Sequence, residues 1–211
     1  GGIPAAIVEM HEKGLVRTVA CSQSFDAVAA KAIVDYPGII EIDNSLYANP
    51  ARKGCMLNRE TFGILAALEV DIDFNVNILT GSNGEMMGGL GGGPDVAAGA
   101  QISIVVLPIV RGRIPSVVKK VFTCCTPGDT VAVVITEAGI ALNPNHKNYQ
   151  ELKEDLEKAS LKLVTIEELR QTAEGLTGTP KPIESTDKIT CIVEYRDGTV
   201  LDVIREIKKQ D

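Results

Sequence analysis

The 211-residue sequence is long enough for one large domain or two small ones with a buried core. Hydrophobic residues make up 45% and charged residues 23% of the chain, and the formal net charge is −7. The negative charge argues against a nucleic-acid partner or an anionic membrane surface. Aromatic residues make up 4% of the chain and none is Trp, so a base-stacking platform for nucleic acid is not expected either.

Membrane and metal classes are also disfavoured by the sequence. No apolar run reaches the roughly 20 residues that cross a bilayer, and no basic-then-apolar secretory start is present. We therefore expect no membrane partner and a cytoplasmic protein. The five cysteines lack the paired spacing of zinc ligands, which favours reduced thiols, and two histidines make a histidine-based metal site unexpected.

Helices and short strands alternate at the start of the chain. A proline start and a glycine stop predict a helix over residues 4–13, and a β-branched strand follows over 15–20. Ser24 can cap a second helix over 26–35, and a strand over 39–42 comes next. This order is typical of a mostly parallel sheet flanked by helices, so the sequence predicts an α/β fold.

The middle of the chain is less regular. Residues 43–53 are typical of a polar loop, and residues 62–70 are interpreted as a buried strand, although periodicity also allows a helix. The Asn-Gly dipeptide within Ser82-Asn83-Gly84 predicts a hairpin of the segments 75–79 and 85–87. Three further strands are predicted over 102–107, 117–125 and 130–136, the last two joined by a turn over 126–129.

The last third has strong local signals. A charged helix is predicted over 149–158 and a strand over 161–164, and Thr165 with Glu168 forms a capping box for a helix through Leu176. After a linker over 177–185, an Asp-Gly turn predicts a hairpin of strands 189–195 and 199–204. We expect an α/β domain over 1–180 and a C-terminal hairpin extension over 181–211 that packs on it.

A glycine-rich loop is the most unusual stretch of the sequence. Six of the seven residues from Gly88 to Pro94 are glycine or proline, and Pro94 and Asp95 suit the first turn of a helix. Such a loop presents free N–H groups to an anion or to a developing oxyanion. A tight turn between two strands explains the same residues, so the loop alone leaves both interpretations open.

Several polar side chains are candidates for chemistry. Asn75 and Asn77 alternate along a strand and share a face, although an edge strand with solvated amides would do the same. Glu137 follows an apolar strand, at the rim where α/β proteins bind ligands, or is a solvated turn residue. Arg111 and Arg113 could grip a phosphate or carboxylate, or decorate an exposed loop.

A row of acidic residues precedes the two asparagines. Glu69, Asp71 and Asp73 alternate, so they share one face, and such a row is usually solvated. Its position beside the asparagines and the glycine loop leaves acid–base catalysis open as a second interpretation.

Four motifs together resemble a known family. Residues 67–71, 75–77, 89–95 and 136–141 occur in the order seen in CoA-transferases of the acetyl-CoA hydrolase/transferase superfamily. The chain is more similar still to the citrate lyase α-subunit family, on residues 41–50, 108–115 and 176–180. The resemblance covers the whole chain and corresponds to roughly the C-terminal half of such a subunit, which would explain the abrupt start.

This resemblance implies a fold and a reaction. The fold would be NagB/RpiA/CoA-transferase-like, and the enzyme would exchange acetate for citrate on the acetyl thioester of an acyl carrier protein. CoA, or the CoA-derived arm of that carrier, would be a substrate, with no cofactor bound covalently. The implied partners are the lyase β subunit, the acyl carrier γ subunit, the missing N-terminal half and further copies of the chain.

Three alternatives remain beside that reading. The chain could be a general acyl-CoA:carboxylate CoA-transferase, or a scaffold half that is inactive without its N-terminal half. A dinucleotide-binding unit built on the glycine loop is a weaker alternative, because the loop follows a predicted hairpin and lacks the acidic residue of that motif.

The resemblance also implies roles for particular residues. The catalytic group would be Asn77, Gly91 and Gly92, and the cofactor-binding group would be Gly89, Gly93 and Asp95. The substrate-binding group would be Asn49, Asn75, Arg111, Arg113 and Glu137. Many relatives carry a nucleophilic glutamate where this chain has Gly1-Gly2-Ile3, and some carry a glutamine at Gly93. These departures favour direct attack by citrate through a mixed anhydride.

Overall fold

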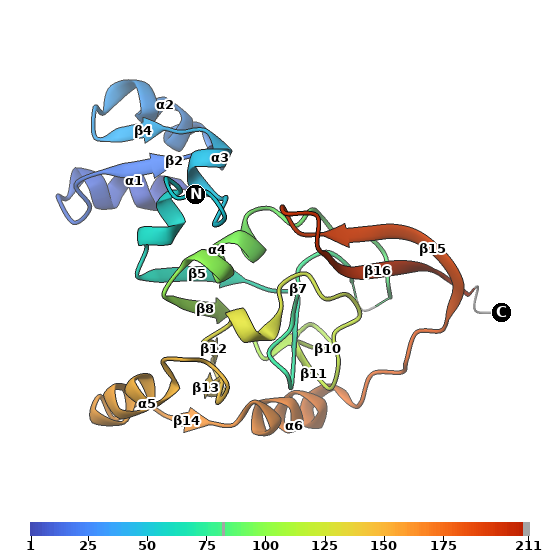
Figure 1. Cartoon of the computed structure of the whole chain (residues 1–211). Helices are drawn as coiled ribbons and strands as arrows, with labels where there is room; N and C mark the ends of the chain where they lie inside the picture. Colours follow the sequence, from blue (N-terminus) through green and yellow to red (C-terminus); the bar gives the residue numbers. More distant parts are fainter. Residues whose placement is uncertain (82, 209–211) are drawn as a thin grey trace. The chain divides into compact units, whose positions relative to one another are not determined.

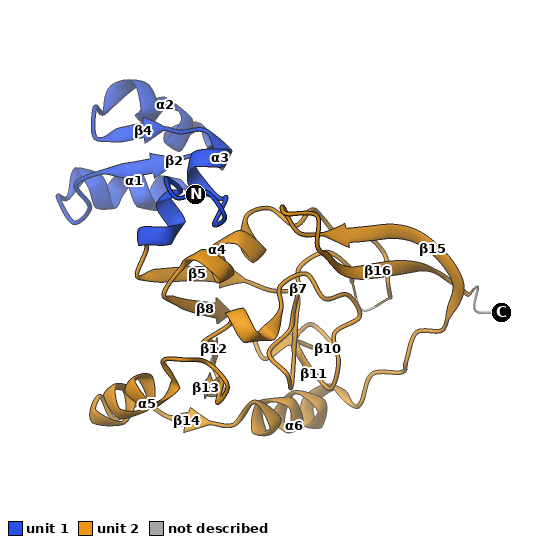
Figure 2. Ribbon diagram, in the orientation of Figure 1, with its two compact units in different colours: residues 1–59 blue, residues 60–211 orange. Residues whose placement is uncertain are grey.

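The computed structural model describes residues 1–81 and 83–208, and the chain divides into two compact units (Figures 1 and 2). Unit 1 is Gly1–Arg59 and unit 2 is Glu60–Asp211. The predicted boundary between residues 180 and 181 stays a prediction. Among the described residues, no helix combines the length and the apolar character that a membrane crossing requires.

Unit 1 is a small α/β unit with its own apolar core. Its strands form two parallel pairs, β2 with β4 and β1 with β3. Its elements are β1 (Gly2–Ile3), α1 (Ala5–Glu12), β2 (Val19–Cys21), β3 (Gln23–Ser24), α2 (Ala27–Asp35), β4 (Ile39–Glu41), α3 (Asn44–Tyr47) and the 3-10 helix η1 (Met56–Arg59). The predicted helices at 4–13 and 26–35 are confirmed, because proline, glycine and acidic signals act locally.

Two predictions in unit 1 are corrected. Ser24 lies in β3, and the cap of α2 is Asp26, whose carboxylate accepts the N–H of Ala29 at 2.8 Å. The same carboxylate accepts the N–H of Ala5 at 2.7 Å, so an acid serves both helices where a serine would reach one. Residues 43–53 contain the short helix α3, capped by Asp43.

Unit 2 is built on a five-stranded sheet in the order β14-β13-β12-β8-β5 (Figure 1). All neighbouring strands are parallel except β12 and β13, which form an antiparallel hairpin. The predicted α/β fold with a mostly parallel sheet is therefore confirmed. The strands are β5 (Phe62–Ala66), β8 (Ile102–Val106), β12 (Val133–Thr136), β13 (Gly139–Leu142) and β14 (Leu163–Val164).

The two faces of this sheet differ in cover. Val105, Val134 and Ala141 are fully buried on one face, in a core shared with Leu169 and Ala173 of α6 (Ile166–Thr177). The other face carries exposed Phe62 and Ile64 at the β5 edge, so the prediction of a buried strand over 62–70 is wrong there. Leu65 pairs with buried Val105, and because side chains alternate along a strand, Phe62 and Ile64 project from the opposite face.

A second, smaller sheet orders the strands β11-β6-β7. It contains β6 (Glu69–Asp71), β7 (Val76–Asn77) and β11 (Val117–Val118), and a tight hairpin of β9 (Val110–Arg111) and β10 (Ile114–Pro115) precedes β11. The predicted strand over 117–125 is wrong beyond Val118. There the N–H groups of Val121 and Phe122 are bonded to side-chain carboxylates instead of a neighbouring strand.

Helices and a long hairpin complete unit 2. The remaining elements are α4 (Gly93–Gly99), the 3-10 helix η2 (Gly128–Thr130), α5 (Tyr149–Lys158), α6, β15 (Ser185–Glu194) and β16 (Val200–Ile207). The predicted α5, the capping box of α6 and the C-terminal hairpin are confirmed. Ser82, in the predicted hairpin turn, lies outside the described residues. On either side of this turn, Thr80 and Met86 form an antiparallel bridge.

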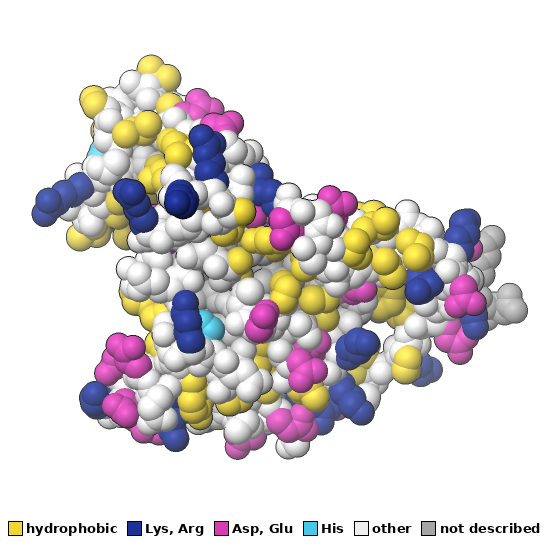
Figure 3. Space-filling view, in the orientation of Figure 1, with side chains coloured by type: hydrophobic (Ala, Val, Ile, Leu, Met, Phe, Trp, Pro, Cys, Tyr) yellow, Lys and Arg dark blue, Asp and Glu magenta, His cyan; other side chains and the backbone are white. Residues whose placement is uncertain are grey.

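The C-terminal hairpin has one packed face and one open face. Val193 and Ile204 are buried against Leu79 and Cys125 of unit 2. Exposed apolar side chains gather over the same hairpin in the space-filling view (Figure 3). Ile189, Ile192 and Val200 of the hairpin are exposed. The hairpin is therefore anchored on unit 2 through one face.

Candidate functional site

A cavity of about 860 Å³ opens in unit 2 beside β6, at the start of the predicted acid–asparagine segment. Its volume lies within the range of ordinary small-molecule sites, roughly 300–1,000 Å³. The buried residues Glu69 and Asp71 line it together with the exposed residues Lys119, Lys120 and Lys181. The cavity thus joins the acidic row to basic residues that lie about 50 or more positions later in the sequence.

Asn77 is held entirely inside this unit. Its side chain is fully buried, and Nδ2 donates to Oε2 of Glu69 at 3.0 Å and to the carbonyl of Thr80 at 2.9 Å. Its Oδ1 accepts the N–H groups of Leu79 and Thr80 at 3.0 and 3.1 Å. Asn77 therefore fixes the chain that leads from β7 toward the glycine loop.

Asp71 organises the neighbouring turn. Its Oδ1 accepts the N–H groups of Asp73 and Asn75, and its Oδ2 accepts Nδ2 of Asn75 and the N–H of Val121. Oδ1 of Asn75 in turn accepts the N–H of Gly128 at 3.0 Å. Asp71 is 1% exposed, and this burial raises the pKa of its carboxyl although the hydrogen bonds act in the opposite direction.

The acidic row is therefore only partly as predicted. Glu69 is 4% exposed and Asp71 is 1% exposed, so the expectation of a solvated row is wrong for both, whereas Asp73 is exposed. The two asparagines supply the reason, since each amide partners one of the two acids.

The glycine loop opens a helix, as predicted. Gly92 is the N-cap of α4, whose first turn carries Pro94 and Asp95. Gly88, Gly89 and Gly91 are exposed, and a Cβ at any of them would meet no atom within 4 Å. Gly91 has a φ of +55°, a left-handed conformation that favours glycine. The loop backbone is thus open to approach by another molecule.

Asp95 faces the C-terminal hairpin. Its carboxylate is 7% exposed and pairs with Arg196, whose Nε and Nη2 lie 3.3 and 3.2 Å from the two oxygens. Gly93 packs beside Ile78, because a Cβ placed on Gly93 would lie 3.3 Å from Cδ1 of Ile78. The pair of Asp95 and Arg196 ties the start of α4 to the turn between β15 and β16.

Glu137 and the two arginines lie on neighbouring segments. Glu137 follows β12 in the turn to β13, and its Oε2 accepts the N–H of Ile109 at 2.9 Å. Val106 pairs with Ile135, so the carboxyl ends of the parallel strands β8 and β12 lie side by side next to this turn. Within the described residues, Nε and Nη2 of Arg111 are buried without a hydrogen-bond partner, whereas Arg113 is exposed.

Asn49 lies in unit 1, and the other candidate residues lie in unit 2. Its backbone N–H contacts Sγ of Cys55 at 3.2 Å, and the carbonyl accepts the N–H of Arg52. The grouping of Asn49 with the unit 2 residues stays a prediction. No cluster of three His, Cys, Asp or Glu side chains suited to a metal ion occurs among residues 1–81 and 83–208.

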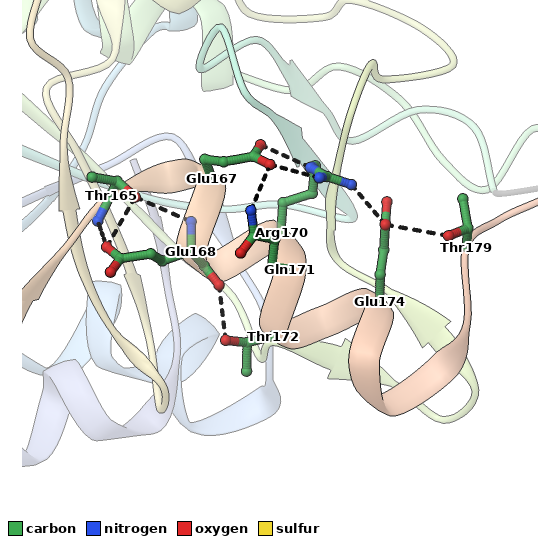
Figure 4. A network of polar contacts seen from close by, with 8 residues as sticks. All are labelled: Thr165, Glu167, Glu168, Arg170, Gln171, Thr172, Glu174 and Thr179. Atoms are coloured by element: carbon green, nitrogen blue, oxygen red, sulfur yellow. Dashed lines mark hydrogen bonds and ion pairs between the residues drawn. The ribbon is translucent and has the colours of Figure 1, made fainter.

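A charged network connects α6 to the segment that lines the cavity (Figure 4). Arg170 bridges Glu167 and Glu174, with 2.6 Å contacts to each, and Glu174 accepts the hydroxyl of Thr179 at 3.3 Å. The hydrogen bond from Arg170 lowers the pKa of Glu167 to about 2. Glu174 and Thr179 both line the cavity, so the network fixes one of its walls.

Sequence reasoning missed part of the cavity. Lys119, Lys120 and Phe122 line it, but they were placed in a strand that ends at Val118. The signal that could have identified them is the adjacent lysine pair, which interrupts the apolar pattern of that strand.

Comparisons with known proteins assign the family. The model of the family described as citrate lyase, alpha subunit (CitF), matches residues 1–207. The citrate lyase alpha chain of Klebsiella pneumoniae is 51% identical over 211 residues, and that of Escherichia coli K12 is 48% identical over 209 residues. These matches cover 100% and 99% of this chain but 41% and 40% of the relatives. The chain therefore spans about two fifths of their length.

Solved structures support the same assignment. The α subunit of citrate lyase from Streptococcus mutans, solved in complex with citrate, is 44% identical with a TM-score of 0.93. That match covers 99% of this chain and 41% of the other. A 4-hydroxybutyrate CoA-transferase from Porphyromonas gingivalis shares the fold at 18% identity, with a TM-score of 0.51 over 75% of this chain and 44% of the other. The chain belongs to the citrate lyase α-subunit family.

Proposed function

We propose that this chain is the part of a citrate lyase α subunit that exchanges acetate for citrate on an acyl-carrier-protein thioester. Acetyl-carrier protein and citrate would give citryl-carrier protein and acetate. The observation that carries this proposal is the TM-score of 0.93 to a citrate lyase α subunit whose structure contains citrate.

The proposed chemistry follows from the open glycine loop. A citrate carboxylate oxygen attacks the acetyl carbonyl, and the C–S bond breaks. The thiolate departs, and a mixed anhydride of acetate and citrate is formed. The thiolate then attacks the citryl carbonyl of that anhydride and releases acetate. The N–H groups of Gly91 and Gly92 are suited to stabilise the oxyanion that develops in each step, because that loop is exposed and sterically open.

The other residues are assigned supporting roles in this proposal. Asn77 acts on the reaction by holding Leu79 and Thr80, so its contacts favour a positioning role. Gly89, Gly93 and Asp95 flank the position proposed for the CoA-type arm. Asn49, Asn75, Arg111 and Arg113 are assigned to the carboxylates of citrate, because their side chains carry hydrogen-bond donors or positive charge. Glu137 is also assigned to substrate binding, as an acceptor for the hydroxyl group of citrate. Among these, Arg111 has buried guanidinium nitrogens that lack a partner in the described residues.

We assign the remaining properties on the same grounds. CoA, or the CoA-derived arm of the carrier, is a substrate, and no covalently bound cofactor is assigned. The partners proposed are a lyase β subunit, an acyl carrier γ subunit, the N-terminal part present in the longer relatives and further copies of the subunit. The relatives are about 2.5 times longer than this chain, which supports the N-terminal partner. A cytoplasmic location accompanies this assignment.

Citrate-dependent release of acetate tests the function. Acetyl-carrier protein is incubated with citrate and with this chain alone, or with the chain fused to the preceding segment of the Klebsiella pneumoniae relative. Acetate and citryl thioester should form in equal amounts with the fusion. A fusion that accepts several carboxylic acids equally would identify a general CoA-transferase, and a fusion with no transfer activity would reject the proposal. Activity restricted to the fusion would assign this chain an essential but incomplete share of the site.

A further inference from the structure

The cavity beside β6 is lined by apolar side chains, one of them aromatic, as well as by charged ones. Its walls include Ile72, Ile114, Val118 and Val121, together with the half-buried ring of Phe122. Pro180, Pro182 and Ile183 close it from the segment after α6. A planar heterocycle can be buried against such a ring and aliphatic walls.

Glu69 supplies a buried acceptor to this interior. Its Oε2 accepts Nδ2 of Asn77 at 3.0 Å and lies 3.5 Å from the N–H of Phe122. Its Oε1 accepts no hydrogen bond from the described residues, although the residue is 4% exposed and lines the cavity. An ionised carboxylate oxygen only accepts hydrogen bonds, so this atom is suited to a ligand N–H.

Three exposed lysines line the cavity. Lys119, Lys120 and Lys181 are exposed and form no ion pair within residues 1–81 and 83–208. Of the carboxylates that line the same cavity, Asp71 is fully hydrogen-bonded and Glu174 pairs with Arg170. Four carboxylates and three ammonium groups therefore line the cavity, but three of the carboxylates are hydrogen-bonded or paired, and of the four only Asp73 is exposed like the lysines.

We propose that this cavity binds the nucleotide end of a CoA-type thioester, with adenine inside and the phosphates at the lysines. The exocyclic amino group of adenine donates to Oε1 of Glu69, and the base packs on Phe122. The phosphates form charge-assisted hydrogen bonds with Lys119, Lys120 and Lys181. This inference rests on the proposed function, because free CoA and the CoA-derived carrier arm both present such a nucleotide.

The test compares thioester donors with and without the nucleotide. In the full-length fusion, the double variant Lys119→Ala/Lys120→Ala should raise KM for acetyl-CoA about tenfold, with kcat unchanged, because charge-assisted bonds to phosphate are lost. KM for acetyl-pantetheine, which lacks nucleotide and phosphates, should not change. The matched control Lys53→Ala/Lys147→Ala removes two exposed charges elsewhere and should affect neither donor.

The binding arm keeps this inference separate from the proposed reaction. ADP is titrated into this chain by calorimetry, and the lysine double variant should weaken its binding about tenfold while the control does not. If ADP binding depends on the lysines but the fusion has no transferase activity, the nucleotide site is supported and the proposed reaction is refuted. Equal changes of KM for both donors, or ADP binding that does not depend on these lysines, would overturn the site. A raised KM for acetyl-carrier protein would identify its arm as the occupant, and an effect on acetyl-CoA alone would identify free CoA.

Discussion

Replacing Asn77 by alanine should loosen the entrance to the glycine loop. The substitution removes the acceptor for the N–H groups of Leu79 and Thr80 and a donor to Glu69. A buried donor left without a partner costs roughly 1–3 kcal/mol, so two such donors cost about 2–6 kcal/mol before any water enters the space. With partial rescue by water, we expect a local destabilisation of about 3 kcal/mol.

Hydrogen exchange measures this effect where it arises. About 3 kcal/mol corresponds to exchange roughly a hundredfold faster at the amides of Leu79 and Thr80. Asn83→Ala is the matched control, because the hydrogen bonds of that exposed side chain within the described residues go to nearby Glu85, so these amides should be unchanged. In the full-length fusion, Asn77→Ala should also lower transferase turnover.

Two results would refute the reasoning about Asn77. Exchange rates at Leu79 and Thr80 that change less than about threefold would show that its amide does not hold this segment. Turnover near that of the unmodified fusion would remove Asn77 from the proposed site. Faster exchange combined with lower turnover supports the positioning role.

Three further outcomes follow from contacts in unit 2. Gly128→Ala should destabilise the chain by about 3 kcal/mol or more in urea unfolding, because a Cβ would lie 1.9 Å from a backbone oxygen; an unchanged midpoint contradicts this. Arg196→Ala should lower the urea midpoint more than Asp95→Ala, since it leaves a buried carboxylate unpaired; the reverse order would contradict the reasoning. Iodoacetamide at pH 8 should label exposed Cys191 before Cys124, because burial raises the pKa of Cys124 to about 12. Peptide mass spectrometry measures the order of labelling, and Cys124 labelled first would contradict this.

The sequence predicts best where structure is determined by neighbours along the chain. The capping box of Thr165 and Glu168 fixes the start of α6, and the Asp-Gly turn fixes the C-terminal hairpin. These signals act within a few residues, so no knowledge of distant contacts is needed. The helix after the glycine loop was predictable for the same reason, because Pro94 suits the first helical turn.

Long-range contacts explain what the sequence left undetermined. Val121 donates its N–H to Asp71, 50 positions earlier, so a segment with strand-like composition does not form a strand. The burial of Glu69 and Asp71 depends on the amides of Asn75 and Asn77, which the turn from β6 into β7 brings back onto the two acids. The cavity was likewise not predictable, because its lysines and its acids come from segments that meet only in the folded unit.

The C-terminal hairpin is attached to unit 2 by contacts that do not need chain continuity. Arg196 pairs with Asp95, and Asp202 accepts the N–H of Cys124 at 2.7 Å. The hairpin also buries apolar side chains of both strands against the unit. A cut within residues 178–184 would therefore yield two fragments that remain associated. The hairpin could thus be supplied as a separate synthetic peptide, carrying isotope labels or non-natural residues, to complement a chain that ends after α6.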